Sequence, residues 1–156
     1  MLWYGVSLII IALDQWTKWL ASAKLEYGQP LEIFSFFNFT LWHNTGAAFS
    51  FLSDAGGWQR GFFATVSALV SVVLVVWMYR LPREQKLLML ALALILGGAV
   101  GNLYDRVALG YVVDFIDVYY KNYHFPAFNI ADSAISVGAG IMLLDMFLNR
   151  HDDSAS

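Results

Sequence analysis

The chain has 156 residues, of which 59% are hydrophobic and only 13% are charged. Soluble domains carry about 25% charged residues, so this composition indicates an integral membrane protein of one domain. A net charge of −3 without any basic tract argues against a nucleic-acid partner. Because the chain has no cysteine, disulfides, thiolate metal sites and a cysteine nucleophile are excluded.

Four hydrophobic segments are long enough to cross a bilayer, and they predict an all-α membrane protein with four transmembrane helices. The segments cover about 2–25, 61–79, 87–104 and 130–148. Lengths near 20 residues match a hydrocarbon core of about 30 Å at about 1.5 Å per helical residue. The first segment contains an acid and a base within its apolar run, so we interpret it as a retained span rather than a cleaved signal peptide.

Asp14 and Lys18 interrupt the apolar run of that first segment. They stand at positions i and i+4, so they share one helix face and can neutralise each other. We predict a structural ion pair that fixes the first helix in the bundle. The alternative, a place for this pair in the active site, stays open.

The segment 26–60 is expected outside the membrane, and its aromatic part does not resemble a hydrophilic connector. Residues 31–52 are rich in Phe and alternate partly with polar residues, and Thr45-Gly46 supplies a turn signal. This pattern predicts short strands rather than a fifth span. An exposed apolar patch of this kind would lie against the bilayer or a lipid-bearing ligand, or else rest on the helix bundle.

The short connection at 80–86 sets the orientation, because it contains Arg80, Arg83 and Lys86. Basic loops remain in the cytoplasm. Four spans then place both termini in the cytoplasm, and the segments 26–60 and 105–129 face outward. The second of these is expected as a plain loop.

The third segment ends in a small-residue face and three polar residues. Gly97 and Gly101 are four apart, which allows neighbouring helices to approach closely. Asn102, Asp105 and Arg106 then emerge together at the outer end. Two interpretations are open: Asp105 and Arg106 form a local salt bridge, or Asn102 and Arg106 hold a substrate backbone or a lipid head group.

Asp114 and Asp132 are the most informative residues of the chain. The first lies inside the apolar run 111–116, and the second stands where the fourth span begins. Acids at membrane depth are costly and are therefore functional candidates. Two carboxyls that converge can share one proton and activate a water. The alternative is that each caps a helix or pairs with a base.

Other function classes fit less well. A proton-coupled carrier would place its acids at the midplane between internal repeats, whereas these acids lie toward the outer face and no repeat is visible. A lipid-binding scaffold would leave both acids without a role. His43 and His124 are too far apart in the sequence to suggest a metal site, and we expect neither metal nor cofactor.

Five motifs give the chain a close resemblance, over nearly its whole length, to the bacterial lipoprotein signal peptidases, also called signal peptidase II. In chain order they are DQWTK at 14–18, NTGAAFS at 44–50, GGAVGNLYDR at 97–106, VVDF at 112–115 and FNIAD at 128–132. Five motifs in order, spaced among four hydrophobic segments, make the resemblance specific.

The resemblance implies an aspartic endopeptidase of the bacterial inner membrane with its active site toward the periplasmic face. Such an enzyme cleaves prolipoproteins N-terminal to a diacylglyceryl-modified cysteine, without a cofactor. Its partners would be these substrates, membrane lipids and globomycin-like inhibitors. The catalytic dyad would be Asp114 and Asp132. Substrate- or inhibitor-binding positions would be Asn44, Gly46, Asn102, Asp105, Arg106, Val112 and Asn129.

The mechanism we expect is general acid–base hydrolysis without a covalent intermediate. One of Asp114 and Asp132 is ionised and takes a proton from water, and the other is protonated and polarises the scissile carbonyl. For a coupled pair the assignment of the proton stays open. Asn44 and Asn129 are candidate donors to the substrate or the dyad, or else amides that satisfy loop backbone.

Overall fold

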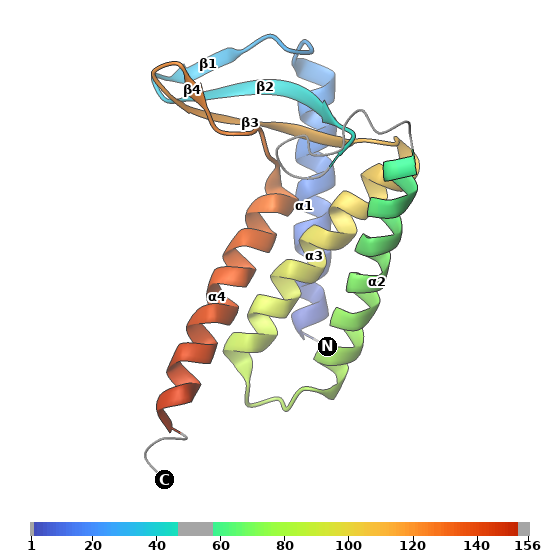
Figure 1. Cartoon of the computed structure of the whole chain (residues 1–156), viewed down its shortest axis with the longest axis vertical. Coiled ribbons are helices and arrows are strands. Elements are labelled where there is room, and N and C mark those ends of the chain that lie inside the picture. The colour runs from blue at the N-terminus through green and yellow to red at the C-terminus, as the bar shows by residue number, and fades with distance from the viewer. Residues whose placement is uncertain (1, 47–57, 153–156) are drawn as a thin grey trace.

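Four long helices form a bundle, and a four-stranded antiparallel sheet covers one end of it (Figure 1). This computed structural model describes residues 2–46 and 58–152. The helices are α1 (Leu2–Lys24), α2 (Trp58–Arg80), α3 (Lys86–Ala108) and α4 (Ile130–Asp152). The strands are β1 (Leu31–Phe34), β2 (Phe37–Asn44), β3 (Val112–Tyr120) and β4 (Tyr123–His124). A mostly helical fold with a small sheet is therefore confirmed.

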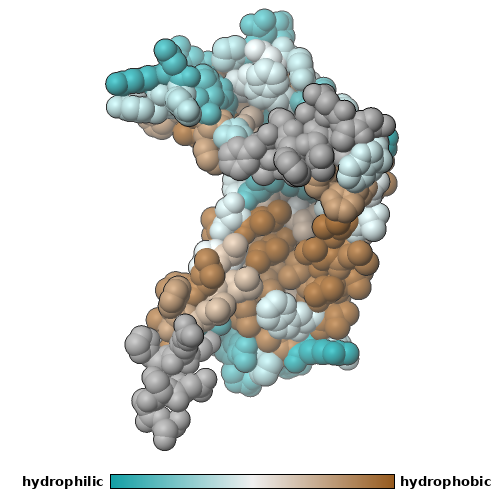
Figure 2. Space-filling model, viewed as in Figure 1, coloured by the Kyte–Doolittle hydropathy of each residue, from teal (hydrophilic) through white to brown (hydrophobic). Residues whose placement is uncertain are grey.

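Three helices of the described chain are long and apolar enough to cross a membrane, namely Arg60–Arg80, Lys86–Ala108 and Ile130–Leu148. α1 is as long, at 23 residues, but contains Asp14 and Lys18. Figure 2 shows hydrophobic residues over the middle of the bundle and hydrophilic residues toward both of its ends. An apolar helix surface that no other element covers is typical of contact with lipid.

α3 lies at the centre of the bundle because its glycines admit the neighbouring helices. A Cβ at Gly97 would lie 2.7 Å from the Cβ of Ile10, and one at Gly101 would lie 2.6 Å from Oδ2 of Asp14. A Cβ at Gly98 would likewise clash with the backbone carbonyl oxygen of Ala131, in the first turn of α4. The predicted close approach is therefore present, and it brings the polar residues of α1, α3 and α4 together.

The sheet has the order β1-β2-β3-β4, and each neighbouring pair is antiparallel. The strands expected within residues 31–52 are present, in the described part of that segment, as β1 and β2. Segment 105–129 differs from the expected plain loop: α3 continues to Ala108, and the rest supplies β3 and β4. The two outer segments thus fold into one sheet.

The first turn of α1, the last turn of α4 and the α2–α3 connection all lie at the end of the bundle remote from the sheet (Figure 1). The sheet and the basic connection at 80–86 are therefore at opposite ends of the molecule. The part of residues 31–52 that follows Gly46 lies outside the described residues, as do Ala47–Ser50 of the second motif.

Candidate active site

A cleft of about 1320 Å³ lies between the sheet and the helix ends beneath it. It opens at the hollow between the sheet and α4, on the left of Figure 2. Six of the predicted site residues line it: Asn44, Asn102, Arg106, Val112, Asp114 and Asp132. Asp105 and Asn129 are not among the lining residues and are 1% and 0% exposed.

Asp114 is carried by β3, opposite Trp42 of β2, and is 3% exposed. Asn129 Nδ2 donates to its Oδ1 at 2.7 Å, and Asn44 Nδ2 donates to its Oδ2 at 3.2 Å. Burial, followed by the neighbouring charge of Asp132, raises the pKa of Asp114 to about 7. A carboxyl with such a pKa can hold or release a proton at neutral pH, which suits acid–base chemistry.

Asp132 stands in the first turn of α4, where a reciprocal cap holds it. The backbone N–H of Asp132 donates to Asn129 Oδ1 at 2.9 Å, and the backbone N–H of Asn129 donates to Asp132 Oδ2 at 3.3 Å. This is the arrangement of a capping box. Asn102 Nδ2 donates to the other carboxylate oxygen at 2.8 Å. The helix start thus fixes Asp132 at the cleft.

Asn129 is bonded to both acids, since its side-chain amide donates to Asp114 while its backbone N–H donates to Asp132. Its Nδ2 also lies 3.2 Å from Asn102 Oδ1 and 3.2 Å from the Val113 carbonyl oxygen. At 0% exposure it faces the acids rather than the open cleft. Of its two interpretations, a donor to the acids is the one this geometry favours.

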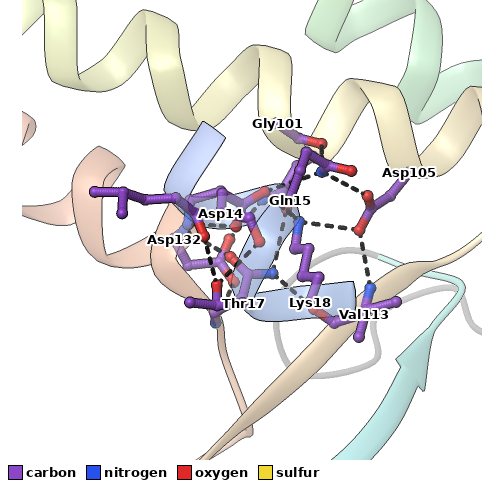
Figure 3. Close-up of polar contacts among 12 residues, drawn as sticks. Asp14, Gln15, Thr17, Lys18, Gly101, Asp105, Val113 and Asp132 are labelled. Atoms are coloured by element: carbon purple, nitrogen blue, oxygen red, sulfur yellow. Dashed lines mark hydrogen bonds and ion pairs between the residues drawn. The ribbon is translucent and has the colours of Figure 1, made fainter. Parts of the chain in front are cut away.

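Lys18 joins a buried network that links three acceptors (Figure 3). Its Nζ lies 2.8 Å from Asp14 Oδ2, 2.9 Å from Asp105 Oδ2 and 2.8 Å from Asn102 Oδ1. Asp14 and Lys18 therefore form an ion pair within a larger cluster. Asp105 pairs with Lys18, and no ion pair joins it to the adjacent Arg106 among the described contacts.

The same network anchors the elements that carry the acids. Asp14 Oδ1 accepts the Ala131 N–H at 2.9 Å, at the start of α4, and Asp105 Oδ2 accepts the Val113 N–H at 3.1 Å, next to Asp114. Gln15 Nε2 donates to Asp105 Oδ1 at 2.9 Å. Sequence reasoning missed Gln15, although its place in a polar interruption of an apolar span is a usable signal.

Asn102 connects this network to Asp132. Its Oδ1 accepts from Lys18, which leaves its Nδ2 to donate to Asp132. An amide side chain has one accepting and one donating end, so a fixed ammonium at the oxygen sets the direction of the NH₂ group. Lys18 is thus linked to Asp132 of the cleft through a single intervening side chain, that of Asn102.

Arg106 brings positive charge to the cleft. Its guanidinium carbon lies 5.8 Å from the centre of the Phe63 ring, a cation–π contact, and Nη1 lies 3.4 Å from the Asn102 carbonyl oxygen. Arg60 of α2 donates to the backbone carbonyls of Arg106 and Val107 at 3.0 and 2.9 Å. α2 therefore holds the end of α3 from which Arg106 reaches the acids.

Asn44 and its neighbours complete the cleft on the β2 side. The Gly46 N–H donates to Asn44 Oδ1 at 3.0 Å, an Asx turn that leaves the amide NH₂ to reach Asp114. Val112 lines the cleft at 2% exposure. His43 and His124 also line it, but the described residues contain no group of three or more His, Asp or Glu side chains suited to a metal.

Comparisons with known proteins agree on one family. The family model described as signal peptidase (SPase) II matches residues 6–148. A lipoprotein signal peptidase of Acinetobacter baumannii (strain ATCC 17978) is 60% identical over 147 residues, which are 94% of this chain and 84% of the relative. One of Teredinibacter turnerae is 61% identical over 143 residues, 92% of this chain and 85% of the relative.

The fold has a solved counterpart as well. A bacterial membrane enzyme determined by the in meso method at 2.3 Å resolution superposes with a TM-score of 0.85 at 30% identity. The match covers 94% of this chain and 88% of that enzyme.

Proposed function

This chain belongs to the signal peptidase II family, and on that premise we propose that it removes signal peptides from prolipoproteins N-terminal to a diacylglyceryl-modified cysteine. The chain is accordingly a membrane peptidase of the aspartic type. The related enzymes are named lipoprotein signal peptidases, and the match covers most of their length.

Asp114 and Asp132 are the proposed catalytic dyad, and the observation that carries this proposal is that Asn129 hydrogen-bonds to both. The two carboxyls share one proton. The ionised carboxyl takes a proton from water as the oxygen attacks the scissile carbonyl, and the protonated carboxyl donates to the carbonyl oxygen. Collapse of the tetrahedral species then returns a proton to the leaving amine and breaks the C–N bond.

The remaining polar residues of the site form two groups, those that line the cleft and those that are buried behind it. Asn44, Asn102 and Arg106 line it, and they are proposed to hold the substrate backbone or a globomycin-like inhibitor. Asp105 and Asn129 are fully buried, so we assign them a positioning role through their bonds to β3 and to the dyad.

The lipid part of the substrate is proposed to bind where the cleft meets the bilayer. Ile135 and Val137 of α4 supply an apolar wall. Trp42 lines the opposite side at 42% exposure. Each methylene of a diacyl group contributes about 0.8 kcal/mol when buried, so an apolar wall that continues into the bilayer favours a lipidated substrate.

The proposed topology is four spans in the bacterial inner membrane, with α1 as the first. The charged groups of α1 do not oppose this, because Asp14 and Lys18 are 0% and 3% exposed and face α3. The side of α1 that is exposed carries Leu8, Ile9 and Trp16. The basic connection at 80–86 then lies in the cytoplasm with both termini, and the sheet lies in the periplasm.

The test is cleavage of a lipidated precursor peptide by the purified protein in detergent. Asp114→Asn and Asp132→Asn should each lower turnover by roughly 10²–10⁴-fold or more, because Asn can neither ionise nor give up a carboxyl proton. Asp145→Asn is the matched control, since Asp145 lies on α4 about 20 Å along the helix from Asp132. Wild-type cleavage by folded Asp132→Asn would contradict the dyad.

A further inference from the structure

A second polar cluster lies on the strand that carries Asp114, and the proposed dyad chemistry does not use it. The side chain of Asp117 is 7% exposed. Its Oδ2 accepts from Thr40 Oγ1 at 3.1 Å and from Asn38 Nδ2 at 3.5 Å, and its Oδ1 lies 2.8 Å from His124 Nδ1. Thr40, Asp117 and His124 all line the cleft, so the cluster belongs to its sheet side.

A β-bulge brings Asp117 to the same side of the sheet as Asp114. In a regular strand, residues i and i+3 point to opposite faces. Here the register of β2 and β3 shifts between Phe39 and Trp42, where two residues of β2 lie opposite one residue of β3, Phe115. At the same place the backbone N–H groups of Phe115 and Ile116 both donate to the Phe128 carbonyl, at 3.1 and 2.9 Å. The irregular pairing lies between the two acids along β3, and both carboxyls line the cleft.

The imidazole of His124 is held on two sides. An ionised Asp117 only accepts hydrogen bonds, so Nδ1 of His124 carries the proton between them. The ring also stacks on Tyr119, with centroids 5.1 Å apart and planes 16° apart. Nε2 has no hydrogen-bond partner among the described residues. The side chain is 53% exposed, so a fixed ring presents one open polar atom at the cleft.

Asn38 shows that the cluster has further hydrogen-bonding capacity. This residue is 6% exposed, and its Oδ1 has no hydrogen-bond partner within residues 2–46 and 58–152. Buried side-chain acceptors are nearly always satisfied. Asn38 is not among the residues that line the cleft, so its buried oxygen is unused hydrogen-bonding capacity inside the cluster rather than a contact point for a ligand.

We propose that Thr40, Asp117 and His124 form a subsite that binds the backbone of the mature segment of the substrate, beyond the scissile bond. The inference rests on the proposed function. Asp117 stands three positions after Asp114 in β3, a distance of about 10 Å. An extended peptide covers about 3.3–3.6 Å per residue, so His124 meets about the third residue after the scissile bond.

A peptide suits this subsite better than a phosphate head group does. The carboxylate of Asp117 accepts hydrogen bonds from three donors. Its negative charge would balance a positive charge on His124, so the cluster has no net positive charge with which to bind a phosphate. The facing wall of the cleft, with Ile135 and Val137, is apolar. In this proposal the acyl chains contact Ile135, Val137 and Trp42, and the mature segment contacts the polar cluster of Thr40, Asp117 and His124.

The first experiment varies the substrate and leaves the enzyme unchanged. Lipidated precursor peptides that end at the modified cysteine are compared with peptides extended by one to four residues. The wild-type kcat/KM should rise about three- to tenfold when the chain reaches about the third residue, through a lower KM, as expected for one hydrogen bond. Equal kinetics along the whole series would overturn the subsite.

The second experiment uses two substitutions of His124. In His124→Asn the amide nitrogen takes the position of Nδ1 and keeps the bond to Asp117, but nothing replaces Nε2. In His124→Gln the amide nitrogen reaches toward the position of Nε2. We expect His124→Asn to lose the gain from substrate extension and His124→Gln to recover part of it. Both should cleave the shortest peptide like the wild type.

Tyr123→Asn is the control on the same strand, because Tyr123 is 86% exposed and is not among the residues lining the cleft. It should retain the full gain from substrate extension. The same loss of gain in Tyr123→Asn, or an unchanged gain in His124→Asn, would overturn the proposal. Failure of the proposed function looks different: the wild type would cleave none of these peptides, or Asp114→Asn would cleave them all.

Discussion

At the scale of single residues, the site consists of acids whose oxygens are nearly all occupied by donors. Asp114 receives two amide N–H groups, and Asp132 receives one amide and one backbone N–H. The amide donors come from asparagines, which carry no charge. Neutral donors orient a carboxyl without forcing it to ionise as strongly as a cation would. Neutral donors are therefore compatible with the proposal that the two acids share one proton.

The pH dependence of catalysis follows from Asp114. Its pKa is raised to about 7, so the proton that the proposed dyad shares would be lost as the pH rises through that value. We expect kcat/KM to fall on the alkaline side of about pH 7, up to tenfold per pH unit. Burial lowers the pKa of His43, so this cleft histidine loses its proton at lower pH than an ordinary histidine and does not account for a fall in kcat/KM above about pH 7.

The measurement is kcat/KM of the wild type from about pH 5 to pH 9 with one lipidated precursor. The control variant Asp145→Asn should show the same decrease in kcat/KM at alkaline pH as the wild type. A flat profile across this range would show that no group with a pKa near 7 takes part in the reaction.

Lys18 is expected to matter for stability before it matters for chemistry. It is 3% exposed and faces Asp14 and Asp105. Lys18→Ala leaves two buried carboxylates without their cation, which costs about 3–5 kcal/mol when a buried pair is broken. Thermal unfolding in detergent should report this loss. If Lys18→Ala melts like the wild type but has no activity, Lys18 acts on the dyad through Asn102 and the structural interpretation is wrong.

At the scale of elements, α3 and β3 do most of the positioning. α3 contacts the other three helices, and its glycines set how closely α1 and α4 approach. β3 carries Asp114 and is held at its start by the bond from the Val113 N–H to Asp105. The dyad therefore depends on a strand and a helix start that are tied to the same central helix.

Gly101→Ala should disturb this arrangement. The new Cβ would lie 2.6 Å from Asp14 Oδ2, so either the Asp14 carboxylate leaves its position beside Lys18 or α1 moves away from α3. Overpacking of this kind costs about 1–3 kcal/mol. The midpoint of thermal unfolding should fall together with activity. Gly140→Ala on α4 is the control, because no atom lies within 4 Å of its Cβ position, and it should leave both quantities unchanged or raise the midpoint.

At the scale of the whole molecule, polar and apolar surfaces are arranged in layers. On the face shown in Figure 2 hydrophobic residues cover the middle of the bundle, and the sheet overhangs the bundle at one end (Figure 1). The sheet itself carries exposed aromatic side chains, including Phe34 and Phe36, which stack with centroids 5.8 Å apart. In the proposed topology this overhang rests near the outer surface of the bilayer, where lipidated substrate arrives.

Polar substitution of Phe34, Phe36 and Trp42 together should raise KM for a lipidated precursor while kcat stays close to the wild-type value. The three side chains are 59%, 56% and 42% exposed, so their loss removes lipid contact rather than core packing. Phe39, which the aromatic pattern of the sequence also suggests, packs on Phe115 and the buried cluster beneath the sheet, and is unsuitable for this test. Unchanged KM in the inserted variant would assign these aromatics a purely structural role.

The sequence by itself determined the features that depend on neighbours along the chain. Hydrophobic runs of about twenty residues predicted the helices, since length and apolar content decide whether a segment can cross a bilayer. Alternation within residues 31–44 predicted strands because side chains in a strand alternate between faces. The five ordered motifs pointed to the family, and the comparisons agree.

Only the tertiary structure decided which residues meet. Asp105 and Arg106 are adjacent in sequence, yet consecutive residues of a helix face different directions, and the partner of Asp105 is Lys18 of another helix. β3 was missed because its apolar residues are buried on both faces, so no alternation marks the strand. Asn129 can likewise bond to both Asp114 and Asp132 only because the starts of β3 and α4 both pack on α3. Packing between segments so far apart in the chain leaves no local pattern in the sequence.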